Sequence, residues 1–385
     1  MGSGQPSVLE AFADGATMTV DFTDIELGSN QIRAYHDQYP IAGIIGVDQE
    51  TTLLAAMASE ILGLRHNAPS AVEATANKHR FRSRLANSGL RAPWFTLISL
   101  DSDTDTDDDD EDEAASMPYP VVLKPLALSA SRGVIRADNP SQFTVARKRI
   151  KAILAATDSQ GDIATHVLVE DYIPGHEVAL EGLLEGGQLR VLALFDKPDP
   201  LEGPYFEETI YLTPSRLPET VQANIIKTVS RAVATLGLRE GPIHAELRIN
   251  DGGAWLLEVA ARSIGGLCSR ALEFGAGGRL EDLIIRHAMG LPATNDGLRP
   301  PATGVMMIPT PGPGLLRRVI GLDDARAVDG IHDAVISIPL GDVLVPVPEG
   351  NAYLGFIFAK GDTPEMVEAA LRLAHEKLEF EIEAL

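Results

Sequence analysis

Apolar residues recur at helical spacing in several parts of the chain. The run TTLLAAMASEILGL (51–64) and residues 219–238 each end at a glycine, as amphipathic helices commonly do. Residues 139–157 open on Asn-Pro and also predict a helix. Near the front of the chain, two strand-like runs at 18–22 and 41–47 flank a polar stretch of helical character. This alternation predicts a small parallel sheet in an α/β unit.

A period-two pattern predicts strands and hairpins through the middle of the chain. EVALEGLLEGGQLRVLALFD (177–196) and PIHAELRINDGGAWLLEVAAR (242–262) each place two apolar runs around a glycine-rich turn. Residues 292–303 are rich in Pro, Gly and Asn and predict a linker. Short strand-like runs follow it, and a closing helix starts at Thr363. The expected fold class is therefore α/β (α+β).

Two glutamates face each other in the second of these hairpins. With a three-residue turn at 251–253, Glu246 lies directly opposite Glu258. Like charges in that position destabilise a sheet, and the strand AWLLEVA around Glu258 is largely apolar. A hard divalent cation bound by both carboxylates would explain the pair, and Mg²⁺ is the common choice beside phosphates. A solvated sheet face is the alternative, and the pair alone does not decide between them.

Three basic residues are further candidates. His244 shares the strand face of Glu246, where it either orients a ligand or is a hydrogen-bonded structural residue. Arg262 follows Glu258 by four residues and is either a charge for a phosphoryl group or a plain surface arginine. Lys124 ends the apolar run VVL. A lysine there needs an anion, which is either a phosphate or a carboxylate of the protein.

Two loops carry weaker signals. Residues 129–134 (SASRGV) offer hydroxyls and a glycine, so their N–H groups can fold over phosphate oxygens. The connector EDYIPGHE (170–177) can pair its backbone with an adenine edge, and its final carboxylate can hold ribose hydroxyls. An ordinary surface turn and an ordinary polar loop are the respective alternatives.

Composition and charge narrow the class of protein. The chain has 385 residues and a formal net charge of −23, which opposes binding to nucleic acid or an anionic membrane. Ten of the 13 residues at 101–113 are acidic and predict a disordered, solvated loop. No apolar run approaches the roughly 20 residues of a membrane span, and no secretory signal is recognised. The single cysteine, Cys268, fits a reducing cytoplasm and is expected to be buried.

The order of these motifs resembles the ATP-grasp superfamily. Lys78, Lys124, the Ser/Gly loop, E-x-x-I-x-G-x-E and E…E-x-x-x-R follow one another along the chain, and the resemblance runs from about residue 18 to the end. The pattern is similar to biotin carboxylase and glycinamide ribonucleotide synthetase. The stretch FDKPDPLEGPYFEETIYLTPS and the signature EVAARSIGG look like the ATP-grasp L-amino acid ligases. The tail resembles the biotin-carboxylase-like C-terminal segment.

The resemblance implies an architecture and an activity. The expected parts are an N-terminal pre-ATP-grasp α/β domain (1–76), an ATP-grasp domain (77–291, with the acidic loop at 101–116) and a C-terminal segment (292–385). The implied activity is an ATP-dependent, ADP-forming carboxylate–amine ligase that makes an amide bond through an acyl-phosphate, with an amino acid as one substrate. ATP and one or two Mg²⁺ ions, with Mn²⁺ as a substitute, are the implied cofactors. A cytoplasmic homodimer acting on small molecules is expected.

The resemblance also implies a role for each matching residue. The residues expected to bind ATP are Lys78, Lys124, Ser129, Ser131, Gly133, Glu170, Tyr172, Ile173, Glu177 and Lys197. The expected metal ligands are Glu246 and Glu258, and the expected catalytic groups are Arg262 and Lys124. The residues expected near the substrates are His244, Glu207, Gly265 and Gly266.

One position departs from the family pattern. Many ATP-grasp enzymes have Asn two residues after the second metal glutamate, as a further ligand, and this chain has Ala260 there. The amino acid ligase branch tends to have alanines at that place, so activity remains compatible with the sequence. Two alternative functions stay open: another ATP-grasp chemistry, such as carboxylation or a purine-pathway ligation, and a nucleotide-binding regulatory protein without catalysis.

Overall fold

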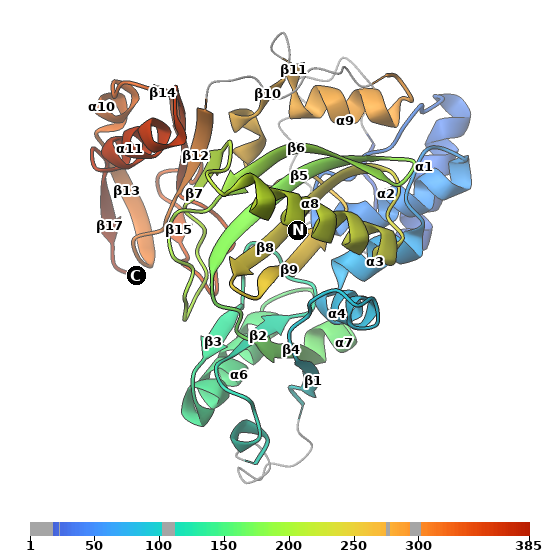
Figure 1. The fold of residues 1–385 in the computed structure, drawn as a ribbon, viewed down its shortest axis with the longest axis horizontal. Helices are drawn as coiled ribbons and strands as arrows, with labels where there is room; N and C mark the ends of the chain where they lie inside the picture. The colour runs from blue at the N-terminus through green and yellow to red at the C-terminus, as the bar shows by residue number, and fades with distance from the viewer. Residues whose placement is uncertain (1–17, 23, 102–111, 275–277, 293–301) are drawn as a thin grey trace.

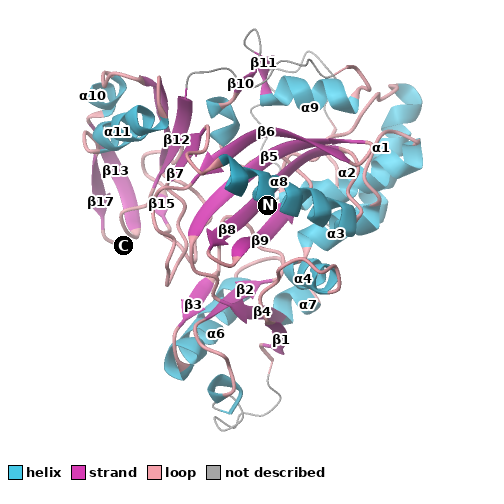
Figure 2. Ribbon diagram, in the orientation of Figure 1, coloured by secondary structure: helices cyan, strands magenta, loops and turns pink. Residues whose placement is uncertain are grey.

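The computed structural model describes residues 18–22, 24–101, 112–274, 278–292 and 302–385. Figure 1 shows a broad upper body built on a large sheet and a narrower lobe below it. The elements of each part are helices and antiparallel strands joined by short loops, as Figure 2 shows by colour. Most of the acidic run, 102–111, lies outside the described residues, and the loop predicted there is not tested.

The N-terminal part is helical. It contains α1 (Ile25–Gln38), α2 (Gln49–Leu62), α3 (Pro69–Ala76) and α4 (Lys78–Ala86). The parallel sheet predicted at 18–22 and 41–47 was wrong, because none of the described residues before Phe95 belongs to a strand. The apolar side chains of those runs pack on the helices instead. Val20, Ile41 and Ile44 cover a small core of Ile32, Leu54 and Ala58 from α1 and α2.

The lower lobe is a four-stranded antiparallel sheet with one long helix. Its strands are β1 (Phe95–Ser99), β2 (Val121–Pro125), β3 (Ile135–Ala137) and β4 (His166–Asp171), in the order β1-β4-β2-β3. The long helix α6 (Pro140–Ala155) is capped by Asn139, and the short α7 (Asp162–Thr165) precedes β4. Phe143 and Ile150 of α6 are buried with Val121 and Val169 of the sheet. The helix predicted at 139–157 is confirmed.

The upper body is centred on an eight-stranded antiparallel sheet. Its order is β14 (Ile331–Ile336), β16 (Gly355–Gly361), β12 (Ala302–Ile308), β7 (Ile210–Thr213), β6 (Gln188–Asp196), β5 (His176–Glu185), β8 (Gly241–Asn250) and β9 (Gly253–Ala260). The amphipathic α8 (Glu219–Leu236), ended by Gly237 at φ +83°, packs with β5, β8 and β9 in one core. The short helix η1 (Cys268–Ala271) and α9 (Leu280–Ala288) share a second core with other side chains of the sheet.

The C-terminal strands continue the central sheet. β12 pairs with β7 through Thr303–Thr213 to Met306–Ile210, so residues of the predicted C-terminal segment extend the sheet of the predicted ATP-grasp domain. The remaining elements are β10 (Glu273–Phe274), β11 (Gly278–Arg279), β13 (Gly314–Ile320), α10 (Leu322–Arg326), β15 (Val343–Leu344), α11 (Pro364–His375) and β17 (Glu379–Glu383). The closing helix predicted from Thr363 is confirmed, with Thr363 as its N-cap.

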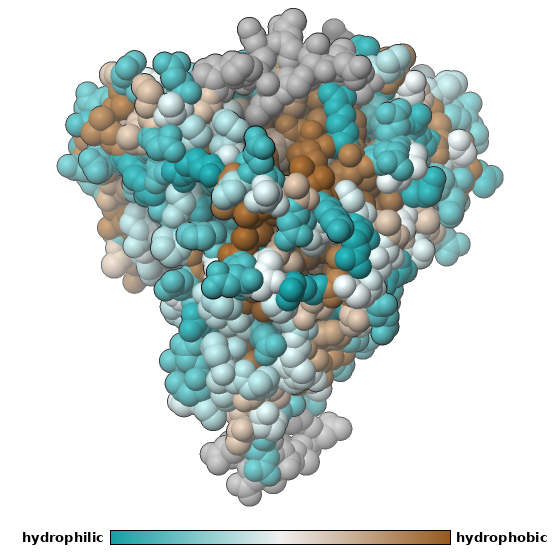
Figure 3. Space-filling model, in the orientation of Figure 1, coloured by the Kyte–Doolittle hydropathy of each residue, from teal (hydrophilic) through white to brown (hydrophobic). Residues whose placement is uncertain are grey.

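The face of the molecule seen in Figure 3 is mostly hydrophilic. Figure 3 shows hydrophilic residues over most of the face in view, with apolar residues gathered in its upper centre. Within the described part of the chain, none of the helices combines the length and apolar character that crossing a bilayer requires.

Candidate active site

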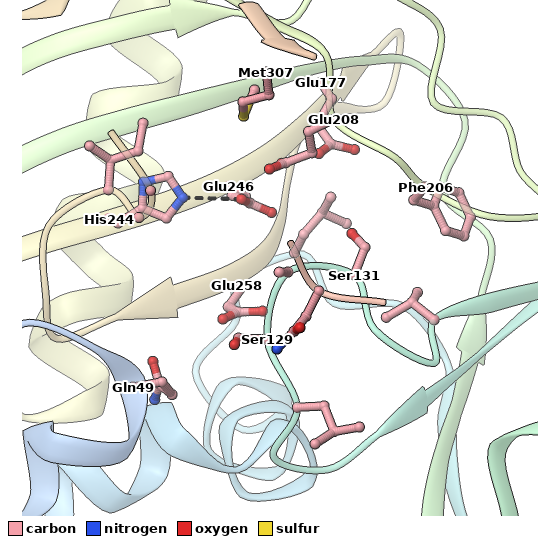
Figure 4. Close-up of a pocket in the computed structure, with 18 of the residues that line it drawn as sticks. Gln49, Ser129, Ser131, Glu177, Phe206, Glu208, His244, Glu246, Glu258 and Met307 are labelled. Carbon is pink, nitrogen blue, oxygen red and sulfur yellow. Dashed lines mark hydrogen bonds and ion pairs between the residues drawn. The ribbon is translucent and has the colours of Figure 1, made fainter. Parts of the chain in front are cut away.

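A cavity of about 480 Å³ lies where the lower lobe meets the large sheet. Its walls come from distant parts of the sequence: the start of α2, strands β2 and β4, the hairpin β8–β9, and a C-terminal stretch that includes Asn351 and Tyr353. Figure 4 shows acidic side chains from the large sheet facing the serines of the 129–134 loop across this space. The cavity is thus enclosed by every part of the predicted architecture.

Most of the predicted site residues line this cavity. They are Lys78, Lys124, Ser129, Ser131, Glu170, Tyr172, Ile173, Glu177, His244, Glu246, Glu258, Arg262, Gly265 and Gly266. Three of the predicted residues do not line it, namely Gly133, Lys197 and Glu207. Glu207 instead accepts a hydrogen bond from the Thr310 N–H, whereas its neighbour Glu208 points into the cavity. The predicted role of Glu207 near the substrates therefore stays a prediction, and Glu208 is the glutamate of this pair that lines the cavity.

Glu246 and Glu258 face each other, as predicted, but for a different reason. The β8–β9 turn has two residues rather than three, since Asn250 pairs with Gly253. A bulge then shifts the register between Glu246 and Leu247, leaving Leu257 as the extra residue, so Glu246 pairs with Glu258 after all. The bulge carbonyls are held from α4: the buried Arg82 guanidinium donates to Leu256 O at 2.6 Å and Leu257 O at 3.0 Å.

Lys197 is buried behind the cavity wall, where it contacts three glutamates that line the cavity. Its Nζ donates to Glu177 Oε1 at 2.8 Å, binds Glu208 and lies 3.4 Å from Glu246 Oε1. Burial would lower the pKa of Lys197, but the three carboxylates raise it well above its ordinary value. Oxygens of the same three glutamates lie within 4.8 Å of one another. Such a set of hard oxygen donors suits Mg²⁺.

One of the two predicted metal ligands belongs to this group of carboxylates and the other lies beside it. Glu246 joins Glu177 and Glu208 in the carboxylate group, whereas Glu258, opposite Glu246 on β9, lies 3.7 Å from Lys78 Nζ. Sequence reasoning missed Glu208, because the residue lies in an irregular segment ahead of β7 where neither periodicity nor turn chemistry separates it from Glu207. Ala260, the departure from the family pattern, is fully buried opposite His244 and has no side-chain oxygen to offer as a ligand.

Glu170 and Lys124 form a second charged group on the lower lobe. Lys124 Nζ binds Glu170, which also accepts from Arg82 Nε at 2.6 Å and Nη2 at 3.1 Å. Burial would raise the pKa of Glu170, but the two cations lower it to about 2. The sequence left a phosphate and a protein carboxylate open as the anion beside Lys124, and the structure shows the carboxylate of Glu170 there. The Glu170 carboxylate, predicted to line adenine, is thus engaged by two basic side chains.

His244 is held between two carboxylates. Its Nδ1 binds Glu181, and its Nε2 lies 3.0 Å from Glu246 Oε1. Burial would lower the pKa of His244, but Glu181 and Glu246 raise it to about 10, so the ring is an imidazolium at neutral pH. Glu181 also accepts from the Ile264 N–H at 3.0 Å, which fixes the loop after Arg262. Sequence reasoning missed Glu181, although it shares the face of Glu177 in an otherwise apolar strand.

The 129–134 loop has an unusual backbone. Ala130 and Ser131 adopt φ of +53° and +54°, a region uncommon for residues with a side chain and often found at functional sites. A Cβ on Gly133 would lie 2.6 Å from Pro125 Cγ, so this position requires glycine. The Gly133 N–H donates to Pro348 O at 2.8 Å, which ties the loop to the C-terminal part of the chain.

One end of the cavity is apolar. Cys268, Met307 and Phe356 line it, and the hydroxyls of Tyr211 and Tyr353 donate to Glu208 at 2.8 and 3.2 Å. The prediction that Cys268 is buried is confirmed, and burial raises the pKa of its thiol. This chamber is suited to an apolar group whose charged end reaches the acidic and basic side chains of the centre.

Comparison with known proteins matches the same parts of the chain. The model of the ATP-grasp domain matches residues 117–271, and that of the L-amino acid ligase C-terminal domain 2 matches residues 306–383. The structure is similar to the L-amino acid ligase from Bacillus licheniformis, with a TM-score of 0.77 and 26% identity over 94% of this chain and 86% of that chain. The expected ATP-grasp fold is confirmed.

Two curated relatives are similar over shorter stretches. Alanine–anticapsin ligase of Bacillus subtilis is 27% identical over 247 residues, which cover 58% of this chain and 50% of the relative. Carnosine synthase 1 of Gallus gallus is 30% identical over 248 residues, which cover 63% of this chain and 27% of the relative. The chain thus spans half or less of the length of these two relatives.

Proposed function

The chain carries an ATP-grasp domain followed by an L-amino acid ligase C-terminal domain, and from this premise we propose that it is an ATP-dependent, ADP-forming carboxylate–amine ligase. It joins the two substrates in an amide bond through an acyl-phosphate, and an amino acid is one of them. The relatives named alanine–anticapsin ligase and carnosine synthase support this assignment.

One observation carries the proposal. A single cavity has basic groups and a serine loop on the lower-lobe side, opposed carboxylates on the sheet side, and an apolar chamber beyond them. Lys78, Lys124 and the 129–134 loop would bind the ATP phosphates, and Glu246 and Glu258 would hold Mg²⁺, with Glu208 nearby. Bound Mg²⁺ would shield the phosphate charge that otherwise repels a carboxylate nucleophile. The chamber then places the acyl donor beside the triphosphate.

The residues act by positioning and charge. A carboxylate oxygen of the acyl donor attacks the γ-phosphorus of ATP and ADP leaves. Lys124 and Arg262 offset the charge that develops on the transferring group. The amine then attacks the acyl carbon and phosphate departs, so no enzyme nucleophile is needed. The imidazolium of His244 is already paired with Glu181 and Glu246, and its role is to orient Glu246.

The other nucleotide contacts remain proposals. Tyr172 and Ile173 would lie along adenine, with the Phe206 ring at 6.5 Å from that of Tyr172 forming one side of the slot. Glu177 would hold the ribose, and Lys197 would hold Glu177 in place from beneath. Gly133 would shape the phosphate loop, while Gly265 and Gly266 let backbone approach the substrate. One or two Mg²⁺ ions, replaceable by Mn²⁺, a homodimer and a cytoplasmic location are proposed on the family resemblance.

The test is ADP release with pairs of amino acids in the presence of ATP and Mg²⁺. We expect ADP formation that depends on both substrates, and Glu258→Gln should abolish it. Glu381→Gln, on the exposed strand β17, is the matched control and should keep full activity. Normal turnover of Glu258→Gln would refute the metal assignment. ADP release with bicarbonate or phosphoribosylamine alone would favour another ATP-grasp chemistry, and ATP binding without ADP formation would favour a regulatory protein.

A further inference from the structure

The 129–134 loop is held from outside by a turn in the C-terminal part of the chain. The Gly133 N–H donates to Pro348 O at 2.8 Å, and Arg132 Nε donates to Glu349 O at 2.8 Å. The second bond spans 217 positions of the sequence. The C-terminal turn therefore lies behind the loop that is proposed to bind the ATP phosphates.

The side chain of Glu349 joins the same turn to the long helix of the lower lobe. Its Oε2 accepts from Arg149 Nη2 at 2.8 Å, and its Oε1 accepts from Arg149 Nε. A bidentate pair of this kind fixes the direction of the two groups as well as their distance. Arg149 lies on α6, which packs on β2 and β3, the two strands that the 129–134 loop connects. Glu349 thus contacts both the loop and the helix that supports it.

The backbone of the loop explains why such support is needed. Ala130 and Ser131 adopt φ of +53° and +54°, and conformations of this kind persist where the surrounding structure holds them. The hydrogen bonds within the loop are long, at 3.2 Å from the Arg132 N–H to Ser129 O and 3.1 Å from the Val134 N–H to Ser131 O. The bonds to the C-terminal turn are shorter, at 2.8 Å, and they follow directly after the two residues with positive φ.

The C-terminal turn is itself tightly built. The Gly350 N–H donates to Pro346 O at 2.9 Å, and a Cβ on Gly350 would lie 1.7 Å from Val345 O. This close approach of backbone to backbone requires glycine. Three residues beyond the turn, Tyr353 lines the cavity and donates from its hydroxyl to Glu208 at 3.2 Å. The turn is thus anchored on the side of the large sheet, from which it reaches the loop of the lower lobe.

We propose that Glu349 is a positioning residue for ATP, which holds the 129–134 loop over the nucleotide phosphates through Arg132 and Arg149. The inference rests on the ligase function proposed above, in which this loop binds the phosphates. Glu349 does not line the cavity, so it acts on the nucleotide only through the loop. Without its side chain the loop is in place in a smaller fraction of molecules, and the apparent affinity for ATP falls by that fraction.

Nucleotide binding by Glu349→Ala tests the proposal. The dissociation constant for a non-hydrolysable ATP analogue with Mg²⁺ should rise about threefold to fivefold, which is the effect of losing a partly exposed ion pair. Arg149→Met should have the same effect, and the two changes together should do no more than either alone. Limited digestion with trypsin gives a second readout, because cleavage after Arg132 reports the opening of the loop. That cleavage should be faster in Glu349→Ala, and the analogue should slow it.

A matched control separates positioning from folding. Glu383 forms a similar exposed pair with Arg317 away from the cavity, so Glu383→Ala should change neither the dissociation constant nor the cleavage after Arg132. A merely structural role of Glu349 would lower the thermal midpoint and leave the affinity for the analogue unchanged. That result, or unchanged cleavage after Arg132, would overturn this inference and leave the ligase function intact. Absence of analogue binding by the wild type would overturn both.

Discussion

Two buried clusters of charged side chains lie on opposite sides of the cavity, and the groups at their centres have opposite charges. On the lower lobe, the Glu170 cluster (Glu170, Arg82 and Lys124) places one carboxylate between two cations. On the large sheet, the Lys197 cluster (Lys197, Glu177, Glu208 and Glu246) places one ammonium among three carboxylates. In both, the central group is almost fully buried, with 2% of the Glu170 side chain and 3% of the Lys197 side chain exposed.

The difference between the clusters matches what each would bind. The Glu170 cluster has one positive charge in excess and faces the space proposed for phosphates. Arg248 pairs with Glu177 at 2.9 Å, and the His244 imidazolium lies between Glu246 and Glu181. With these groups counted, the Lys197 cluster still has one negative charge in excess, so it favours an added cation. A charge inside a protein is costly unless paired, and each cluster pairs its central group while leaving one sign in surplus at the cavity. The two surpluses of charge match the opposite charges of the metal–triphosphate unit that we propose binds in this cavity.

The largest effect is expected from breaking the Lys197 cluster at its centre. Lys197→Met leaves three carboxylates close together without their cation, and the free energy of unfolding should fall by about 3–5 kcal/mol. The free energy of unfolding is measured by urea titration of the variant and the wild type. Lys360→Met, which breaks the partly exposed pair with Glu273, is the matched control and should cost less than about 1 kcal/mol.

Adding Mg²⁺ to the same experiment tests whether the three carboxylates bind a cation. If the carboxylates form a cation site, Mg²⁺ should stabilise Lys197→Met more than it stabilises the wild type, because the ion replaces the missing positive charge. A loss of stability no larger than that of Lys360→Met would show that the three carboxylates do not depend on Lys197.

The sequence indicated several charged residues of these clusters, but not which residues they pair with. Lys124 stands out because it ends an apolar run, Glu246 because it faces Glu258 in a hairpin, and Glu177 because it closes the 170–177 connector. Arg82 does not, since it lies in a helix with three other lysine or arginine residues, and its contact with Leu256 spans 174 positions. The opposition of Glu246 and Glu258 was predicted from the wrong turn length, and a bulge restored the register. Local patterns thus indicate where charges lie, but long-range packing decides which charges meet.

The N-terminal part shows the opposite outcome. Its alternating pattern predicted strands, yet the apolar residues of 18–22 and 41–47 are used in covering α1 and α2. A short apolar run is compatible with a strand or with an extended segment packed by its side chains, and only a hydrogen-bonding neighbour separates the two.

A smaller loss of stability is expected from the Glu170 cluster, and it should occur within a defined range of pH. The pKa of Glu170 is about 2 in the folded protein, below the ordinary glutamate value of 4.5, because Arg82 and Lys124 stabilise its charged form. Its contribution to stability is therefore fully present above about pH 4.5 and is lost as the pH falls toward 2, amounting to about 3 kcal/mol. The difference in unfolding free energy between wild type and Glu170→Gln should shrink across that window. A difference that stays constant from pH 5 to 2.5 would contradict this assignment.

The smallest loss of stability is expected from breaking an ion pair that is exposed to solvent. Arg149 donates from Nη2 to Glu349 Oε2 at 2.8 Å and links α6 to the C-terminal part, but 37% and 42% of the two side chains are exposed. Water and salt screen such a pair, so Glu349→Gln should lower the unfolding free energy by less than about 1 kcal/mol, and less still at high salt. Urea unfolding at two ionic strengths measures both changes. A loss as large as that of Lys197→Met would mean that pairing, rather than burial, sets the energy of these charges, and the contrast between the two clusters would then lose its basis.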